Sequence, residues 1–149
     1  MIEAVVCHIV NGDRILLIYK KRGHGAGKYN GVGGKIEEGE SPKECVLREA
    51  KEELGIELMN VEKVGEIMFY NVNGEDWFVY IFLATNYRGK EKESDEVSPK
   101  WFPISRIPYE KMWEDDSIWL PKVLEGIKFR ATFWFSGEEM RGYEIKKNK

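Results

Sequence analysis

Residues 34–56 constrain this chain more than any other stretch, because a glycine-rich loop there leads into a short acidic helix. Ser41 suits the N-cap position, and Pro42 suits the first helical position, where its missing N–H costs nothing. Glu44 stands three residues after Ser41 and completes a capping box. A glycine directly after residue 54 is placed to end the helix. These signals predict a helix over residues 42–54.

This helix has an apolar face and an acidic flank when its residues are spaced at about 100°. The apolar face, which we expect to pack on a sheet, consists of Val46, Leu47, Ala50 and Leu54. Glu49 and Glu53 lie side by side on the flank as i and i+4, and Glu52 lies next to Glu49 as i and i+3. Such carboxylates repel by roughly a few tenths of a kcal/mol per pair. A divalent cation would turn this repulsion into a binding site, and carboxylates with substrate phosphates favour Mg²⁺ or Mn²⁺.

The same pattern also fits a solvated acidic helix with a surface ion pair between Arg48 and Glu52. The longer spacing decides between the two interpretations. Gly34, Glu40 and the run REAKEELGI at residues 48–56 together resemble the Nudix box at every defined position. A chance match to so many spaced positions is much rarer than a match to a short motif. The resemblance therefore favours a metal-binding helix.

The resemblance implies a Nudix hydrolase, which cleaves a nucleoside diphosphate linked to another moiety and uses Mg²⁺, with Mn²⁺ as an alternative. By position, Glu49 and Glu53 match the main metal ligands of the family, and the carbonyl of Gly33 matches a backbone ligand. Glu52 matches a further ligand or an acid–base position, and Glu96 matches a carboxylate that can approach the metals. The positions that orient the loop and the helix are matched by Arg48 and Glu40.

The mechanism that the resemblance implies is attack of water on phosphorus, with a nucleoside monophosphate and pyrophosphate as products. Metal ions would stabilise the developing charge and lower the pKa of the water. Glu52 is the first candidate for the general base and Glu96 is the second, with Arg48 as a supporting catalytic residue. Lys35, directly after the glycines, is placed to contact the phosphates.

The segment from Lys20 to Asn30 is a basic, glycine-rich loop that precedes the box. Its closely spaced glycines suggest unusual φ angles or a close approach of the backbone to a ligand. A flexible, solvated surface loop is the alternative. Its position beside the expected phosphate site favours a role in binding, so Lys20 and Asn30 are candidate substrate-binding residues.

Similarity to one branch of the family extends over nearly the whole chain. The segments 20–30, 93–96, 101–102 and 112–119 resemble the MutT-type oxidised-purine nucleoside triphosphatases, especially the animal form. In that branch the base pocket is formed by the positions that correspond here to Asn30, Phe69, Trp113, Asp115 and Asp116.

The chemistry of these residues suits a purine. Trp113 offers a flat apolar face, and the amide of Asn30 offers donors and an acceptor to a base edge. Asp115 and Asp116 are adjacent, so desolvation and mutual repulsion should raise the pKa of at least one carboxyl group. A protonated carboxyl group donates and an ionised one accepts. The alternative is an acidic helix N-terminus favoured by the helix dipole, with Trp113 as a core residue.

Three residues depart from the animal branch. His24 stands in place of a phenylalanine at the mouth of the pocket, Val5 replaces a hydroxyl residue, and Asn71 replaces an aromatic residue. These departures leave the base preference open. The other substrates to consider are ADP-ribose, dinucleoside polyphosphates and other nucleoside triphosphates, and a nucleotide-binding module without turnover is the alternative from a different class.

The rest of the chain predicts an α/β protein with a mixed sheet. The expected strands cover residues 2–10, 14–19, 61–72, 76–86, 99–107, 128–135 and 139–146. Residues 88–98 are expected as an exposed loop, and a second helix, capped by Asp116 or Ser117 and disturbed by Pro121, should end near residue 125. The lysine-rich end should fray. With one helix on each face, this agrees with the Nudix fold, an α/β/α sandwich around a mixed β-sheet, as a single domain over residues 1–149.

The charge of the chain limits its partners. A net charge of −3 disfavours long nucleic acid and anionic membranes, whereas a small nucleotide is compatible if metals neutralise its phosphates. Cys7 and Cys45 form no disulfide framework and no metal spacing, and His8 is expected to be structural. No leader segment and no apolar run of about 18 residues is present in the sequence, so we expect a cytoplasmic, reduced protein. We expect it to act as a monomer.

Overall fold

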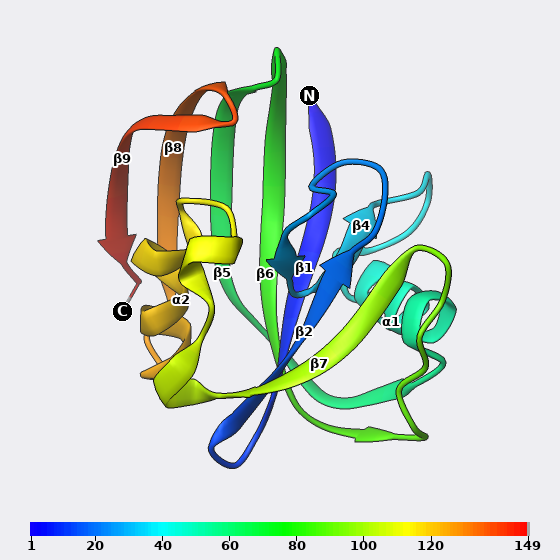
Figure 1. Cartoon of the computed structure of the whole chain (residues 1–149). Helices are drawn as coiled ribbons and strands as arrows, with labels where there is room; N and C mark the ends of the chain where they lie inside the picture. Colours follow the sequence, from blue (N-terminus) through cyan, green and yellow to red (C-terminus); the bar gives the residue numbers. More distant parts are fainter. Residues whose placement is uncertain (149) are drawn as a thin grey trace.

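The computed structural model describes residues 1–148, in which one large mixed sheet lies between two helices (Figure 1). In chain order the elements are β1 (Ile2–Asn11), β2 (Arg14–Lys20), β3 (Tyr29–Asn30), β4 (Val32–Lys35), α1 (Pro42–Leu54), β5 (Glu57–Val72), β6 (Glu75–Arg88), β7 (Val97–Pro103), two 3₁₀ turns (Ile104–Arg106 and Tyr109–Lys111), α2 (Asp116–Leu124), β8 (Phe129–Gly137) and β9 (Glu139–Lys147).

The sheet runs in the order β3-β2-β1-β6-β5-β8-β9, with β4 paired to β1 and β7 paired to β2. The pairs β1–β6 and β5–β8 are parallel, and the neighbouring pairs such as β5–β6 and β8–β9 are antiparallel. The mixed sheet that the sequence predicts is therefore confirmed. Among the described residues, neither helix combines the length and the hydropathy that a membrane crossing requires.

The side chains of β1 divide the core between the two faces of the sheet. Val5, Cys7 and Ile9 belong to the cluster that packs against α1, whereas Ala4 belongs to the cluster that contains the α2 residues Trp119 and Leu120. This alternation follows from the period of two along a strand. The helices therefore cover opposite faces, as predicted, and the α/β/α sandwich is confirmed.

Helix α1 begins and ends where its local sequence predicts. The hydroxyl of Ser41 accepts from the N–H of Glu44 at 3.1 Å, and the carboxylate of Glu44 accepts from the N–H of Ser41 at 2.9 Å. Gly55 ends the helix in the left-handed region at φ 71°. The expected apolar face is wrong at one position, because Leu47 is 37% exposed and Cys45 is fully buried in its place. Cys45 packs against the end of β4, where its Sγ lies 3.5 Å from the carbonyl oxygen of Lys35.

Several boundaries differ from the expected ones. β5 starts at Glu57 rather than 61, and within it Asn60 has a positive φ of 54° that breaks the alternating pattern. β7 ends at Pro103, where a 3₁₀ turn follows. Helix α2 has Asp115, not Asp116 or Ser117, at its N-cap position, and it continues through Pro121.

The C-terminal strand is longer than expected. β9 continues through Lys147, and the N–H of Asn148 donates to the carbonyl of Lys128 at 2.8 Å. The predicted fraying is therefore wrong up to Asn148, since these residues pair with β8 and the segment before it. Lys149 lies outside the described residues.

Candidate functional site

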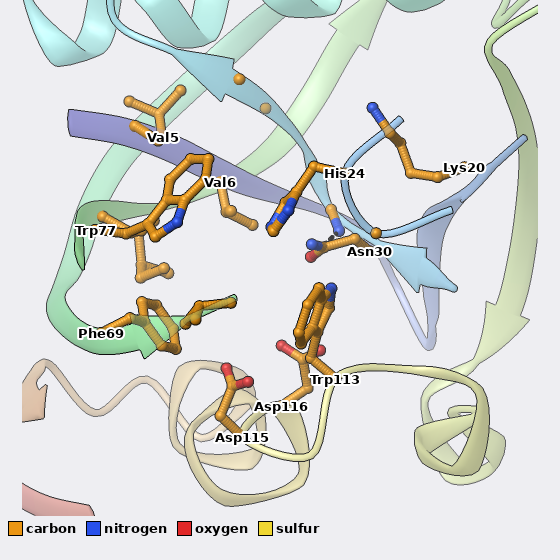
Figure 2. A pocket seen from close by; sticks show the side chains of 18 of the residues that line it. Val5, Val6, Lys20, His24, Asn30, Phe69, Trp77, Trp113, Asp115 and Asp116 are labelled. Carbon is orange, nitrogen blue, oxygen red and sulfur yellow. Dashed lines mark hydrogen bonds between the residues drawn. The ribbon is translucent and has the colours of Figure 1, made fainter. Parts of the chain in front are cut away.

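A pocket of about 280 Å³ lies between the N-terminal half of the sheet and the segment that leads into α2 (Figure 2). Residues from separate parts of the chain line it, and they include a cluster of large aromatic side chains and a few polar groups. Of the predicted site residues, those that line this pocket are Lys20, Asn30, Gly33, Lys35, Phe69, Trp113, Asp115 and Asp116. The fold thus gathers in one cavity predicted site residues that are up to 96 positions apart, from Lys20 to Asp116.

Asp115 and Asp116 form the buried polar end of the pocket. Their exposed fractions are 3% and 2%. The indole N–H of Trp119 donates to Oδ2 of Asp115 at 2.8 Å, whereas Oδ2 of Asp116 has no partner among the described residues. Neither behaves as the helix cap considered above, because Asp115 makes no capping hydrogen bond and Asp116 is the first residue inside α2.

Burial favours the neutral form of both carboxyl groups. Desolvation raises the pKa of Asp115 to about 6, against the lowering effect of the hydrogen bond from Trp119. Desolvation and then the charge of Asp115 raise the pKa of Asp116 well above its ordinary value. At neutral pH, the pair therefore favours one protonated carboxyl group at Asp116, which can donate a hydrogen bond into the pocket.

Asn30 and Trp113 both line the pocket. Oδ1 of Asn30 accepts from the N–H of Gly31 at 2.8 Å, and this bond fixes the orientation of the amide. Figure 2 shows this amide group pointing into the pocket. Trp113 is 9% exposed, and one face of its indole stacks on the imidazole of His24 with ring centroids 5.3 Å apart.

Of the residues that depart from the animal branch, two line the pocket and one does not. Val5 and His24 are lining residues. Asn71 instead donates from its side-chain amide to the carbonyl of Phe135 at 3.3 Å, and its N–H donates to Asp76. The register of β5 shifts between Phe69 and Val72, so Val72 lines the pocket and Asn71, at φ 60°, points elsewhere.

The carboxylates of α1 lie next to the glycines of β4, behind the pocket. A Cβ added to Gly34 would stand 2.7 Å from the carboxyl carbon of Glu49, so that carboxylate is packed directly on the strand. Oε1 of Glu53 is buried without a hydrogen-bond partner in the described part of the chain. Burial, followed by the charge of Glu49, raises the pKa of Glu53 to about 7, whereas Lys20 and the backbone of Gly33 lower it.

Arg48 holds the glycine loop against α1. Its guanidinium binds both carboxylate oxygens of Glu40, from Nε at 2.6 Å and from Nη2 at 2.9 Å. It also donates to Glu49 at 2.6 Å and to the carbonyl of Lys35 at 3.3 Å. The hydrogen bonds from Arg48 lower the pKa of Glu40 to about 2. Arg48 and Glu40 thus have the orienting geometry that their positions suggested.

The last two predicted residues, Glu52 and Glu96, do not line the pocket. Glu52 is mostly exposed and accepts from Arg48 at 3.1 Å. Glu96 is also exposed, and its carboxylate lies 3.5 Å from Arg22. In residues 1–148 no three acidic, histidine or cysteine side chains are gathered at the spacing of a complete metal site. Glu49 and Glu53 therefore offer a partial site.

The partial site fits a hard divalent cation. The unpaired, buried oxygen of Glu53 lies beside a second carboxylate, and the pair is costly unless a proton or a cation neutralises it. Both side chains of the pair are carboxylates, whose oxygens suit Mg²⁺ or Mn²⁺. The carbonyl of Gly33, water and substrate phosphates would have to supply the remaining ligands.

Sequence reasoning did not single out Trp77, which lines the pocket and stacks on His24 with ring centroids 4.9 Å apart. Among the aromatic residues of the hairpin around Asn73 and Gly74, the sequence places Phe69 in the pocket and no other. The register of that hairpin identifies Trp77 as a pocket residue. Trp77 pairs directly with Phe69, so the two side chains lie on the same face of the sheet.

Comparisons with known proteins agree with this geometry. The family model described as a NUDIX domain matches residues 1–123. The chain is 42% identical over 133 residues to the oxidized purine nucleoside triphosphate hydrolase of Danio rerio, covering 89% of this chain and 85% of that protein. It is 40% identical over 132 residues to the protein of the same description in Mus musculus, covering 88% and 85%. It resembles the crystal structure of the MutT protein of Bacillus halodurans with a TM-score of 0.87 at 29% identity, covering 98% of both chains.

Proposed function

Because the chain belongs to the Nudix hydrolase family, we propose that it hydrolyses oxidised purine nucleoside triphosphates such as 8-oxo-dGTP. The products would be a nucleoside monophosphate and pyrophosphate, and the reaction would remove damaged nucleotides from the pool. Two animal relatives carry this description over most of their length. The fold class and the enzyme class that the sequence predicts are confirmed by the same comparisons.

The observation that carries this proposal is the content of the pocket. An apolar, aromatic cavity ends in Asn30, Asp115 and Asp116, and the Glu49–Glu53 pair lies just beyond the glycines that line its other side. A purine nucleotide has the matching parts, because its base is flat and carries hydrogen-bonding edges while its phosphates seek cations. The pocket and the adjacent carboxylate pair therefore account for binding of both the base and the phosphates.

For the base, Trp113 would supply the stacking face and Phe69 part of the wall. The amide of Asn30 would bind one edge of the purine. Asp116, whose neutral form is favoured by its raised pKa, would donate to an acceptor on the base, while Asp115 is held by Trp119 and can accept. In 8-oxoguanine the N7 acceptor of guanine has become an N–H donor and C8 carries a carbonyl acceptor, so a pair with one accepting and one donating carboxyl group would distinguish the oxidised purine from its parent.

For the phosphates, Lys20 and Lys35 line the pocket on the side of the β4 glycines and would bind phosphate oxygens. Nudix hydrolases act with a divalent metal ion, and here Glu49, Glu53 and the carbonyl of Gly33 would hold it. The ion, which we propose to be Mg²⁺ with Mn²⁺ able to replace it, would supply charge stabilisation and a more acidic water. Arg48 would keep Glu49 in place through their 2.6 Å hydrogen bond.

Glu52 and Glu96 are the two candidates for the general base, and Glu96 is also a candidate metal ligand. Each is bound to an arginine in the free protein, Glu52 to Arg48 and Glu96 to Arg22. Acting as the base would require either carboxylate to leave its partner. Catalytic hydrogen bonds often form only in the substrate complex, so these pairs do not exclude either residue.

We propose further that residues 1–149 act as a single domain, as a monomer in the cytoplasm, on free nucleotides rather than on long nucleic acid or membranes. The net charge of −3 supports the last part, since a partner with many phosphates would require a basic surface.

A substrate panel tests the proposed function. We would measure kcat/KM with Mg²⁺ for 8-oxo-dGTP, dGTP, dCTP, ADP-ribose and a dinucleoside tetraphosphate. The proposal requires 8-oxo-dGTP to be the best substrate of this panel and dGTP to be poorer. A higher kcat/KM for ADP-ribose or the dinucleoside tetraphosphate would assign a different Nudix reaction, and binding without any turnover would indicate a nucleotide sensor.

A further inference from the structure

The pocket contains an unusual column of stacked rings. The imidazole of His24 lies between the indoles of Trp77 and Trp113, with ring centroids 4.9 Å and 5.3 Å away and interplanar angles of 22° and 24° (Figure 2). The ammonium group of Lys35 lies 5.6 Å from the Trp77 ring, and that of Lys28 lies 5.0 Å from the Trp113 ring. A flat ring therefore fills the space between two flat apolar faces.

His24 reaches this space from the tip of a loop whose base is fixed. The N–H of Lys20 donates to the carbonyl of Lys28 at 3.0 Å, and the N–H of Gly27 donates to the carbonyl of Lys20 at 2.9 Å. At the tip, His24 stands between Gly23 and Gly25, which have φ angles of 82° and 79°. Glycines in this region allow the backbone to change direction at little steric cost. Two turns close the tip, since the N–H of Ala26 donates to the carbonyl of Gly23 and that of Lys28 donates to the carbonyl of Gly25, both at 3.1 Å. Displacement of the imidazole therefore requires rotation of the His24 side chain and leaves these turns in place.

The proposed substrate needs the same space. A purine that stacks on Trp113 while its edge reaches Asn30 and Asp116 must lie against the indole face that His24 covers. Across that space, Trp77 presents a second face nearly parallel to the imidazole. An aromatic slot that holds one planar ring in the free protein is shaped to hold another.

We propose that His24 occupies the place of the base in the free protein, and that a bound purine displaces it and is then held between Trp113 and Trp77. This inference rests on the proposed function and adds two roles to it: Trp77 becomes the second stacking face, and His24 becomes a built-in competitor. The apparent affinity for nucleotide is then the intrinsic affinity reduced by the fraction of molecules in which the slot is free. A change at His24 that weakens its stacking, with both indoles intact, should therefore strengthen nucleotide binding.

Binding of the product 8-oxo-dGMP measures this competition without turnover. In the variant His24→Ala the competing ring is gone, so Kd should fall by about three- to tenfold, the range expected for aromatic stacking. His24→Phe retains a flat ring in the slot and should not show this gain. A Kd for His24→Ala that is unchanged or higher than that of the wild type would overturn the proposal, because His24 would then be neutral or a contact to the base.

The role of Trp77 is tested in the His24→Ala variant. This variant has no competing imidazole, so a change at Trp77 acts on the bound base alone. Trp77→Leu in that background should raise Kd about three- to tenfold through loss of one stacking face. Trp134→Leu is the matched control, because Trp134 is an exposed tryptophan on β8 that does not line the pocket. Equal effects of the two substitutions would remove Trp77 from base binding.

Nuclear magnetic resonance follows His24 directly, since the chain has only one other histidine, the buried His8. Stacking between two indoles should shift the carbon-bound imidazole protons of His24 upfield, and 8-oxo-dGMP should return them towards ordinary values. Binding that leaves these signals unmoved would refute the displacement alone. Failure of 8-oxo-dGMP and of the other nucleotides in the panel to bind would refute the proposed function, and the displacement with it.

Discussion

Asp115 and Asp116 place two adjacent carboxyl groups in a site with almost no access to water. Burial is the main cause of their raised pKa values, and the charge of Asp115 raises the pKa of Asp116 further. Burying two carboxyl groups lowers the stability of the folded protein. It also favours selectivity, because a base that does not match them leaves a buried carboxyl group without a hydrogen-bond partner. We therefore expect selectivity for the base to depend on Asp115 and Asp116 more than on the carboxylates of α1.

Replacing at least one of the two aspartates by asparagine should lower selectivity for the oxidised base. An amide cannot change its protonation state, so at least one of Asp115→Asn and Asp116→Asn should lower kcat/KM for 8-oxo-dGTP about tenfold, which is roughly 1.4 kcal/mol. Hydrolysis of dGTP should fall much less, because the residues proposed to bind phosphate and metal are untouched. The measurement is the ratio of kcat/KM for the two substrates, and an unchanged ratio in both variants would exclude the aspartates from base recognition.

The same residues should make the stability of the free protein depend on pH. Asp115 titrates in the folded state at a pKa of about 6, above its unfolded value of about 3.9, so the folded state binds more protons between these values. Stability should therefore be highest below about pH 4 for this group and should fall as the pH rises towards 6. For Asp116 the decline extends to higher pH, since its pKa is raised further.

Urea unfolding at pH 4.5 and pH 7.5 tests this expectation. Asp116→Asn removes the titration of this group. The free energy of unfolding of the variant minus that of the wild type should therefore be larger at pH 7.5 than at pH 4.5. The comparison of two pH values cancels any constant effect of the new amide. A difference that is the same at both values would mean that Asp116 is ionised in the folded protein.

At the scale of elements, β4 forms the wall between the pocket and α1. Gly33 lies opposite Val6 in the β1–β4 ladder, and a Cβ on Gly33 would stand 2.0 Å from the carbonyl oxygen of Val5. Such an approach is far closer than any real contact, so the glycine is required for the two strands to pair. The close packing also fixes the Gly33 carbonyl that we propose as a metal ligand.

Gly33→Ala should separate β4 from β1 and lower stability by about 1–3 kcal/mol, the usual cost of forced overpacking. Hydrolysis should fall as well, because the proposed carbonyl ligand and the adjacent Glu49 contact move with the strand. Gly142→Ala is the control, since a Cβ there meets nothing within 4 Å and should change stability by less than about 0.5 kcal/mol. If chemical denaturation gives the same stability for both variants, β4 does not have the tight pairing described here.

At the scale of the whole molecule, the parts that sequence predicts well are those fixed by local chemistry. The bounds of α1 follow from Ser41, Glu44 and Gly55, which act on their own neighbours. Trp77 could not be separated from the core, because an aromatic residue that lines a pocket has the same hydrophobic pattern as one that fills it. The direction of the Asn71 side chain cannot be predicted from the sequence, because the β5 bulge changes which side chains face the pocket. The position of such a bulge depends on the neighbouring strands. The column formed by His24, Trp77 and Trp113 joins three distant segments, so only the tertiary structure reveals it.

Divalent cations should stabilise the whole fold through the Glu49–Glu53 pair. At about a hundred times Kd, binding contributes about 2.7 kcal/mol, and a chain of this size gains about 2–4 °C in Tm per kcal/mol. A thermal shift with Mg²⁺ should therefore appear in the wild type and largely vanish in Glu53→Gln. Glu139→Gln, an exposed change on β9, serves as the control. An undiminished shift in Glu53→Gln would place the cation elsewhere.

The most direct test of the central claim is product analysis of 8-oxo-dGTP hydrolysis by chromatography, in the wild type and in Glu53→Gln. The wild type with Mg²⁺ should release 8-oxo-dGMP and pyrophosphate, with no orthophosphate as the first product. Glu53→Gln should retain the wild-type circular dichroism spectrum and lose most turnover, because one carboxylate of the proposed metal pair is neutral. Release of orthophosphate with a nucleoside diphosphate, or near-normal turnover by Glu53→Gln, would contradict the proposed reaction and its metal site respectively.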